Sequence, residues 1–413
     1  MHSKTPPGLI LTFAVIAVAC GSSDSSTATL EDGLALFRQN KMEEAAPIFE
    51  SLASREPDRA EPYVWLAETY RRLRQNERAV KIAGIALELE PCNTMAHTVM
   101  ADASVPPAAV SDLAGSDTSW THLLAAIDCD PTDGNVWESA WGLAIRRDDP
   151  GMMRQSVRRM AETGFLTPAA LAFGRWLVAT LPDNAILITN GDMDTYPAMA
   201  VQEAQGLRPD VAVVERGLLN MPWGMRFYRD HLGVPIPLPD SDLAALGPSR
   251  TEDGDLVHPA DRIFAHWVQD QRDGSATRPV ALAATVYRDF FDQVEDDLQY
   301  AGPYWRVVGR PLEQPRDTVA LRASLAAIVP GDFVGPWVSD QDYSPIRGMT
   351  TRNLARSVTH SALVYAEELR EAGRRDEALT TVNWAEQFED STELGPSLTD
   401  RINELRASLA VRQ

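Results

Sequence analysis

Apolar and small side chains recur at helical spacing along the first part of the chain, and the whole pattern repeats after 34 residues. Pro57 and Pro91 stand 34 residues apart, and each closes a stretch with the periodicity of two consecutive helices. Small residues occupy the places where antiparallel helices must approach closely: Gly33, Ala45, Ala67 and Ala79. The pattern therefore predicts two helix–turn–helix units between residues 29 and 96.

A repeat of this length, with these small positions and with Leu66 and Tyr70 at large ones, resembles the tetratricopeptide family. The resemblance implies a stack of helical hairpins whose concave face binds a peptide or a protein partner. A second interpretation stays open, in which the stack is a spacer or a rigid clamp on a neighbouring domain.

Weaker helical units follow the first two. Residues 92–131 form a third unit, in which the start of the first helix and the end of the second lie at the same end of the hairpin. We therefore predict a disulfide between Cys92 and Cys129, the alternative being two small buried thiols. A fourth pair completes a helical-repeat domain over residues 29–180, and residues 351–413 form one more unit with a last amphipathic helix.

The central part of the chain has a different pattern. From about residue 181, short apolar runs alternate with helices, and the expected strands cover residues 185–189, 210–214, 278–286 and 304–308. This alternation predicts a mostly parallel sheet covered on both faces, a Rossmann-like α/β domain. The domain spans residues 181–312, and residues 313–350 are expected to be a linker. The predicted fold class is thus α plus α/β, with helical repeats at both ends.

The central part also looks like the soluble region that follows the membrane domain in bacterial protein O-mannosyltransferase-like membrane proteins. The segments that carry this resemblance are residues 181–197, Gln202-Glu203, 206–211, 218–223, Arg278-Pro279-Val280 and 302–308. The resemblance does not supply an activity for this module. The chain also lacks the multi-spanning part that would hold the transferase site, so glycosyl transfer does not carry over.

The loop after the 185–189 strand carries the main candidate for a ligand site. Ligands of open α/β sheets bind at the carboxyl ends of strands, where backbone N–H groups at a helix start converge. Asp192 and Asp194 are spaced like the carboxylate pair that holds a divalent cation and sugar-nucleotide phosphates in some glycosyltransferases. Asn190 would add a polar contact, and Thr195 is a further possible ligand-binding residue. In the alternative interpretation, Asp194 or Thr195 caps the helix and Asp192 braces the turn.

The N-terminus carries a targeting signal. The apolar run Leu9–Ala19 is shorter than the ~20 residues that a membrane-spanning helix needs, so residues 1–19 are expected to be a secretory signal peptide. The run ends in Ala17-Val18-Ala19-Cys20-Gly21, which resembles the bacterial lipobox, although Ala17 stands where Leu is usual.

The lipobox resemblance implies that Cys20 receives a lipid anchor and that residues 20–28 are a flexible tether. Gly21 after the cysteine implies the outer membrane of the bacterial cell envelope, with the protein facing the periplasm. An ordinary secreted protein with a free thiol at Cys20 is the alternative. No later stretch reaches 18 apolar residues, so membrane attachment is expected through the lipid alone.

Composition and the absence of known motifs narrow the range of possible functions. The formal net charge is −21, from 59 acidic and 38 basic side chains, which excludes a general nucleic-acid binder. The sequence has no nucleophile elbow, no phosphate-binding Gly-x-x-x-x-Gly-Lys loop and no His-Glu-x-x-His, so we predict no catalytic residue, and whether the chain is an enzyme stays open, with a binding role favoured.

The expected function is therefore that of a lipid-anchored envelope protein. Its helical repeats would bind a protein partner and serve as an assembly scaffold, with a link to envelope glycosylation or export. The alternative is a sugar-binding or sugar-phosphate-binding protein or enzyme, with Asp192 and Asp194 as metal or hydroxyl ligands. A divalent cation belongs only to that alternative, and no other cofactor is expected.

Overall fold

The computed structural model describes residues 28–105, 116–333, 335–344, 347–392 and 396–410. The predicted signal peptide, the predicted lipidation residue Cys20 and all but the end of the tether lie outside the described residues. Within the described part, no helix combines the length and the apolar character needed to cross a membrane.

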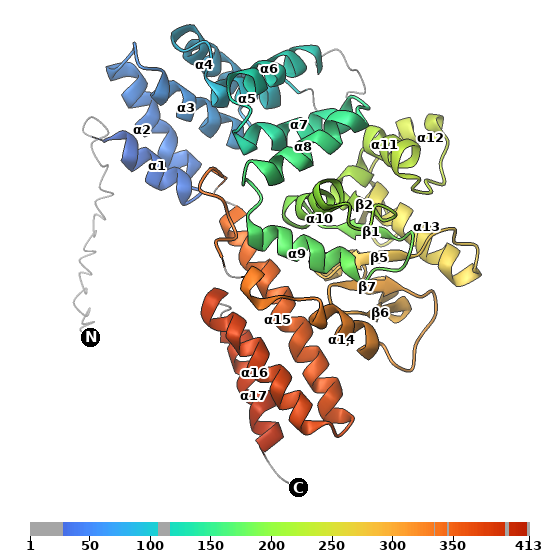
Figure 1. The fold of residues 1–413 in the computed structure, drawn as a ribbon. Coiled ribbons are helices and arrows are strands. Elements are labelled where there is room, and N and C mark those ends of the chain that lie inside the picture. The colour runs from blue at the N-terminus through green and yellow to red at the C-terminus, as the bar shows by residue number, and fades with distance from the viewer. Residues whose placement is uncertain (1–27, 106–115, 334, 345–346, 393–395, 411–413) are drawn as a thin grey trace, which may run out of the picture.

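Helical hairpins build the N-terminal part of the molecule (Figure 1). The helices are α1 (Leu30–Arg38), α2 (Met42–Arg55), α3 (Ala60–Arg72), α4 (Asn76–Leu89), α5 (Thr94–Ala103), α6 (Ser116–Cys129), α7 (Gly134–Arg146) and α8 (Pro150–Glu162). The small residues predicted at helix crossings are buried, and a Cβ atom on Gly33 would overlap the Phe49 ring. The 34-residue pattern therefore predicted the first two hairpins, α1–α2 and α3–α4, correctly.

Polar side chains just before the helices explain where several of them begin. The Thr29 hydroxyl accepts the Asp32 N–H at 3.3 Å before α1, and the Asn93 amide oxygen accepts the Ala96 N–H at 2.9 Å before α5. Before α8, the Asp149 carboxylate accepts the Met152 N–H at 2.9 Å. Such caps satisfy N–H groups that have no partner inside the helix.

A disulfide joins Cys92 and Cys129, whose Cα atoms are 5.4 Å apart. Cys92 precedes α5 and Cys129 is the last residue of α6. The bond therefore ties together the two ends of the third hairpin.

A five-stranded sheet follows the repeats. Its order is β2 (Ala212–Glu215), β1 (Ile186–Thr189), β5 (Val280–Ala283), β7 (Tyr304–Val307) and β6 (Leu298–Tyr300). β1 is parallel to both of its neighbours, whereas β7 is antiparallel to β5 and to β6. The sheet is therefore mixed: the predicted parallel arrangement holds for β2, β1 and β5, whereas β7 runs against its neighbours, because β6 and β7 form a tight hairpin and such a connection joins antiparallel strands.

Further helices and a small hairpin surround the sheet. They are α9 (Pro168–Ala179), α10 (Asp192–Gln205), α11 (Pro222–Leu232), α12 (Asp240–Ala245), α13 (Pro259–Asp273) and the hairpin of β3 (Ser249–Arg250) with β4 (Leu256–Val257). α10 packs against both α8 and α9, so it connects the repeats to the sheet. A Cβ atom on Gly174 of α9 would overlap the Pro197 carbonyl oxygen of α10, so only glycine allows this approach.

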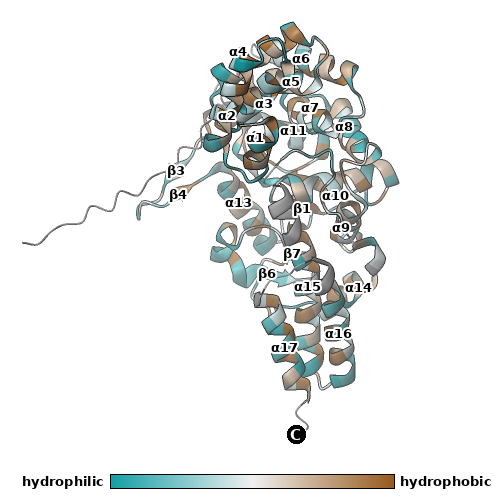
Figure 2. Ribbon diagram, turned by 90° about the vertical axis from the view of Figure 1, so that its left-hand side faces the viewer, coloured by the Kyte–Doolittle hydropathy of each residue, from teal (hydrophilic) through white to brown (hydrophobic). Residues whose placement is uncertain are grey.

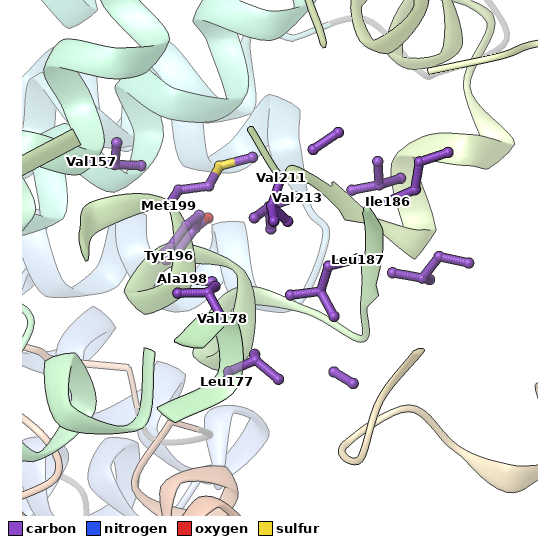
Figure 3. Close-up of a cluster of buried hydrophobic side chains, with 14 of the residues drawn as sticks. Val157, Leu177, Val178, Ile186, Leu187, Tyr196, Ala198, Met199, Val211 and Val213 are labelled. Atoms are coloured by element: carbon purple, nitrogen blue, oxygen red, sulfur yellow. The ribbon is translucent and has the colours of Figure 1, made fainter. Parts of the chain in front are cut away.

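One apolar core runs from the repeats into the sheet (Figure 3). Val157 of α8 lies near Met199 of α10, and Leu187 of β1 lies on the other side of α10. All of these side chains are buried. The repeats and the sheet therefore share a core, which stabilises their relative position.

The C-terminal part is helical, as expected, and begins earlier than the predicted unit. α14 (Thr318–Ala326) lies inside the segment expected as a linker, and α15 (Arg347–Glu371), α16 (Arg375–Thr392) and α17 (Pro396–Ala410) follow. Figure 2 shows these last helices projecting from the body of the molecule. They have a core of their own, built around buried Leu369, Val382 and Ile402.

Candidate functional site

The carboxyl ends of β1 and β5 open into a cavity of about 520 Å³. From β1 the chain continues through α10 to β2 on one side, whereas β5 lies on the other side and is reached only after α13. Ligands of open α/β sheets bind where connections diverge in this way. Residues 190–194 after β1 and residues 284–288 after β5 line the cavity. The position of the cavity agrees with the one that the sequence pattern favours for a ligand.

The helical repeats supply the opposite wall. Arg72 of α3 and Glu138 of α7 face the loops of the sheet across the cavity. A smaller cavity of about 390 Å³ has Arg72, Glu138 and Asp192 in common with it. The two cavities adjoin, and we call them together the cleft.

Asp194 caps α10. Its carboxylate accepts the N–H groups of Asn190 at 2.8 Å and Gly191 at 3.0 Å, and it also accepts the Thr285 hydroxyl. Burial raises the pKa of Asp194, and these hydrogen bonds act in the opposite direction. The side chain is 2 % exposed. Its oxygens therefore act inside the protein, where their hydrogen bonds hold the loop after β1 in place and join it to the loop after β5.

The other residues predicted for the site divide into two groups. Asn190 and Asp192 line the larger cavity, and the Asn190 Oδ1 atom is buried without a hydrogen-bond partner. Thr195 is fully buried and lies away from the cavity, with its hydroxyl 2.6 Å from that of Thr189. No cluster of three or more His, Cys, Asp or Glu side chains suited to a metal ion occurs among the residues that the structure describes.

Glu215 is a further acidic group at this edge of the sheet, and the sequence analysis missed it. It ends β2, and its carboxylate accepts the N–H groups of Gly217 at 2.8 Å and Leu218 at 2.9 Å. Burial raises the pKa of Glu215 to about 7, and the nearby charges of Asp192 and Asp194 add to the effect. Its place at the end of the second predicted strand was the signal that could have identified it.

Charged side chains of α3 also went unnoticed. The Glu68 carboxylate is buried and accepts hydrogen bonds at 2.6 Å from Arg71 and from Arg72. Burial alone would raise the pKa of Glu68, but the two guanidinium groups outweigh it and lower the pKa below its usual value. Arg71 also pairs with Asp102 at 3.3 Å. The three- and four-residue spacing of Glu68 from the two arginines was visible in the sequence.

A third hollow, of about 600 Å³, lies on the repeats themselves. Its lining comes from the first helices of three hairpins, with Phe37 on α1, Trp65 on α3 and Met95 on α5. Residues 338–344 of the same chain form its other wall, and Figure 1 shows this orange segment beside α1. We call the hollow the repeat groove and residues 338–344 the strap.

Aromatic and polar contacts hold the strap. The rings of Tyr343 and Trp65 meet edge to face with centroids 6.1 Å apart. The Asn135 amide donates to the Gln341 carbonyl oxygen at 2.9 Å, and the Gln341 amide donates to the Thr163 carbonyl oxygen at 3.3 Å. The strap thus contacts the repeats from α1 to the turn after α8.

Comparison with known proteins gives two partial matches. The family model described as tetratricopeptide repeat matches residues 36–103, which cover the first hairpins. The model described as TMEM260-associated domain 2 matches residues 170–239, which run from α9 through α11 to the end of the loop before α12. No curated protein matches the chain. The first match supports tetratricopeptide repeats within residues 36–103, and the central match is consistent with the resemblance to the soluble module of mannosyltransferase-like membrane proteins.

Proposed function

We propose that this chain is a lipid-anchored protein of the bacterial cell envelope that binds a protein partner through its tetratricopeptide repeats and so acts as an assembly scaffold. The observation that carries the proposal is the repeat groove, which α1, α3 and α5 line on one side and an irregular segment of the same chain lines on the other. A surface of this kind suits a partner segment because apolar anchors and main-chain hydrogen bonds are both available.

The location is part of the same proposal. Cys20 carries the lipid, and the tether lets the folded body lie on the periplasmic face of the outer membrane. Replacing Cys20 by Ser removes the acylation site, so we expect the variant to leave the membrane fraction while the wild type stays there. Fractionation of cells fed a labelled fatty acid tests this, and a Cys20→Ser chain that remains labelled and membrane-bound would contradict it.

The central domain supports a link with envelope glycosylation or export. The support is the partial match with a TMEM260-associated domain, together with the resemblance of the same segment to the module behind mannosyltransferase-like membrane domains. In this proposal the Rossmann-like α/β domain contacts the glycosylation or export machinery, and the repeats bind the protein partner.

The scaffold role is tested with the intact chain in detergent-solubilised envelope. A chemical crosslinker should join the wild type to one specific protein, and Trp65→Ala should lose that product, because Trp65 is at the centre of the groove. Trp120→Ala on α6 is the matched control, since Trp120 is a partly exposed tryptophan outside the groove lining. A product that is equally strong in all three proteins, or no product, would refute binding through the groove.

A second function is favoured by one specific observation. The buried and unpartnered Asn190 Oδ1 atom lies at a cavity of about 520 Å³ that Asp192 also lines. An unsatisfied buried acceptor is costly and suits a donor from a bound molecule, so a sugar or sugar-phosphate hydroxyl is the proposed donor. A divalent cation at Asp192 belongs to this second candidate.

The test is a thermal-unfolding screen of the protein against simple sugars, sugar nucleotides and divalent cations. A ligand that binds only the native state raises the unfolding midpoint. Asp192→Asn should abolish that rise and leave the unliganded midpoint close to wild type, whereas Asp194→Asn should lower the unliganded midpoint because Asp194 caps α10. A rise that survives in Asp192→Asn would refute the assignment.

A further inference from the structure

We propose that the strap is an internal ligand of the repeat groove and that the partner displaces it with a segment of the same chemistry, an extended stretch with an acidic residue beside an aromatic one. This inference rests on the proposed scaffold function and names the chemistry of the partner. It concerns residues 338–344, with the sequence Val-Ser-Asp-Gln-Asp-Tyr-Ser.

The first argument is the anchor of the strap. Tyr343 inserts its ring against Trp65, which in turn meets Phe37 with ring centroids 5.2 Å apart. Burial of the Tyr343 hydroxyl raises its pKa well above the usual range, and the nearby charges of Glu68 and Asp133 add to the effect. Aromatic anchors of this kind supply much of the binding energy at protein interfaces. An aromatic side chain from a partner would fit the same place.

The second argument is main-chain recognition. The Asn135 amide donates to the Gln341 carbonyl oxygen, and this contact does not depend on which side chain the strap carries at that position. Most of the strap has no regular secondary structure, and it makes only a short turn at 339–342, with the Asp342 N–H donating to the Ser339 carbonyl oxygen at 3.0 Å. Another chain in a similar conformation can therefore accept the same hydrogen bond.

The third argument is charge. The strap carries Asp340 and Asp342 and no basic residue. Arg38 lines the groove at one end, and Arg71 and Arg72 line the cleft where the strap ends. Complementary charge favours an acidic segment over a basic one and speeds its approach. Among the described residues, Arg38 is the one charged side chain that the repeats contribute to the groove lining, and it pairs with Glu31, whereas Arg71 and Arg72 pair with Glu68 behind the cleft wall.

The fourth argument is that release of the strap from the repeats costs little free energy. Asp340 and Gln341 are exposed, and the other strap residues are only partly buried. Segments with few buried apolar contacts open locally at low free-energy cost. Tyr343 and Ser344 also line the cleft, so displacement of the strap would open the groove into the cleft and connect the two hollows.

The test uses a fluorescently labelled peptide with the strap sequence and the full-length protein in detergent. A tethered competitor has a high effective concentration, so the wild type should bind the free peptide weakly. Tyr343→Ala removes the anchor of the resident segment, and we expect it to bind the free peptide at least about tenfold more tightly. Adding Trp65→Ala to Tyr343→Ala should abolish that binding. Equal affinity of wild type and Tyr343→Ala, or no binding to Tyr343→Ala, would overturn the inference.

Two controls make the result specific. Leu256→Ala removes an apolar side chain that is 50 % exposed on the β3–β4 hairpin and lines neither the groove nor the cleft, so it should bind the peptide as the wild type does. A peptide with the tyrosine replaced by alanine, or with both aspartates replaced by asparagine, should bind Tyr343→Ala less tightly than the original peptide. A peptide in which lysine replaces both aspartates, and which binds as well as the original, would overturn the inference that the groove prefers an acidic segment. Unfolding midpoints of all variants, recorded in parallel, report whether each is folded.

Failure of this inference differs from failure of the scaffold function. If no envelope partner is found and Tyr343→Ala still gains peptide affinity, the strap is an internal ligand and the proposed function fails. If a Trp65-dependent partner is found and Tyr343→Ala shows no gain in peptide affinity, the strap is a permanent part of the fold and only the inference fails. Hydrogen exchange of the strap provides an independent readout, since its amides should exchange faster when the peptide is added to the wild type.

Discussion

Glu215 is a buried acid whose proton is retained to unusually high pH. Its pKa is raised from 4.5 to about 7, so the folded protein keeps a proton that the unfolded chain has already lost in this range. Stability is therefore fully present below about pH 4.5 and is lost as the pH rises through about 7. We expect the unfolding midpoint of the wild type to fall more between pH 5 and pH 7.5 than that of Glu215→Gln, which does not ionise.

Thermal unfolding in a series of buffers checks this expectation. Glu313→Gln is the matched control, because Glu313 is an exposed glutamate in a loop, and it should follow the wild-type profile. A Glu215→Gln profile parallel to that of the wild type would show that the carboxyl group titrates as an ordinary surface acid.

Gly174 allows α9 and α10 to touch. A Cβ atom at this position would overlap the Pro197 carbonyl oxygen, which is main chain and does not move independently of α10. We expect Gly174→Ala to destabilise the protein by about 1–3 kcal/mol, as other overpacked sites do. Gly84→Ala in α4 should be neutral or stabilise by up to about 1 kcal/mol, because no atom lies within 4 Å of its new methyl group and alanine favours helix. Denaturant unfolding of both variants makes the comparison, and equal midpoints would contradict the close approach.

The individual site residues were only partly predictable. The sequence placed Asn190, Asp192 and Asp194 where a strand turns into a helix, and in the structure Asn190 precedes α10 while Asp192 and Asp194 lie in its first turn. Sequence spacing could not separate the roles of the two aspartates, because capping and ligand binding use the same side chain. Orientation decides between these roles, and Asp194 turns back to the N–H groups of Asn190 and Gly191.

At the scale of elements, the Cys92–Cys129 disulfide closes the third hairpin over a separation of 37 residues. A bond that closes a loop of this length restricts the unfolded chain and contributes about 3–4 kcal/mol. We therefore expect the Cys92→Ser, Cys129→Ser double variant to unfold at lower denaturant concentration than the wild type. A reducing agent should lower the wild-type midpoint to the same value and leave the double variant unchanged. A wild-type unfolding midpoint that does not change on reduction would contradict this contribution of the disulfide to stability.

The elements themselves were predicted best where the pattern is local. The 34-residue period gave the first two hairpins, and the expected strands near 185, 210, 278 and 304 correspond to β1, β2, β5 and β7. The direction of β7 was not predictable, because it depends on the pairing of β7 with β6. β6 itself was missed, since it follows an acidic stretch that has the pattern of a solvated surface, whereas Asp297 is buried and pairs with Arg272 at 2.5 Å.

At the scale of the whole molecule, the repeats and the sheet share one core. Trp141 of α7 is buried, its ring centroid lies 5.0 Å from that of Tyr196, and its indole N–H lies 3.4 Å from the Met199 sulfur. We expect Trp141→Ala to destabilise the repeats and the sheet together by about 3–5 kcal/mol. Trp120→Ala is the control, because Trp120 is only partly buried, and it should cost less.

Circular dichroism and tryptophan fluorescence followed through denaturant unfolding separate the outcomes for Trp141→Ala. A shared core predicts that both probes shift together in this variant. A variant in which the repeats unfold alone, while the sheet keeps the wild-type midpoint, would contradict the shared core.

The sequence by itself determined the helical hairpins, the positions of the first strands and the presence of a polar loop after β1. These features depend on periodicity and on caps within a few residues, and such signals are local. The tertiary structure alone decided that the sheet is mixed, that Glu215 lies near Asp192, that the α3 arginines line the same cleft as Asp192, and that the strap forms one wall of the repeat groove. These features depend on contacts between residues far apart in the chain, such as Tyr343 with Trp65, and their formation depends on how the whole core packs.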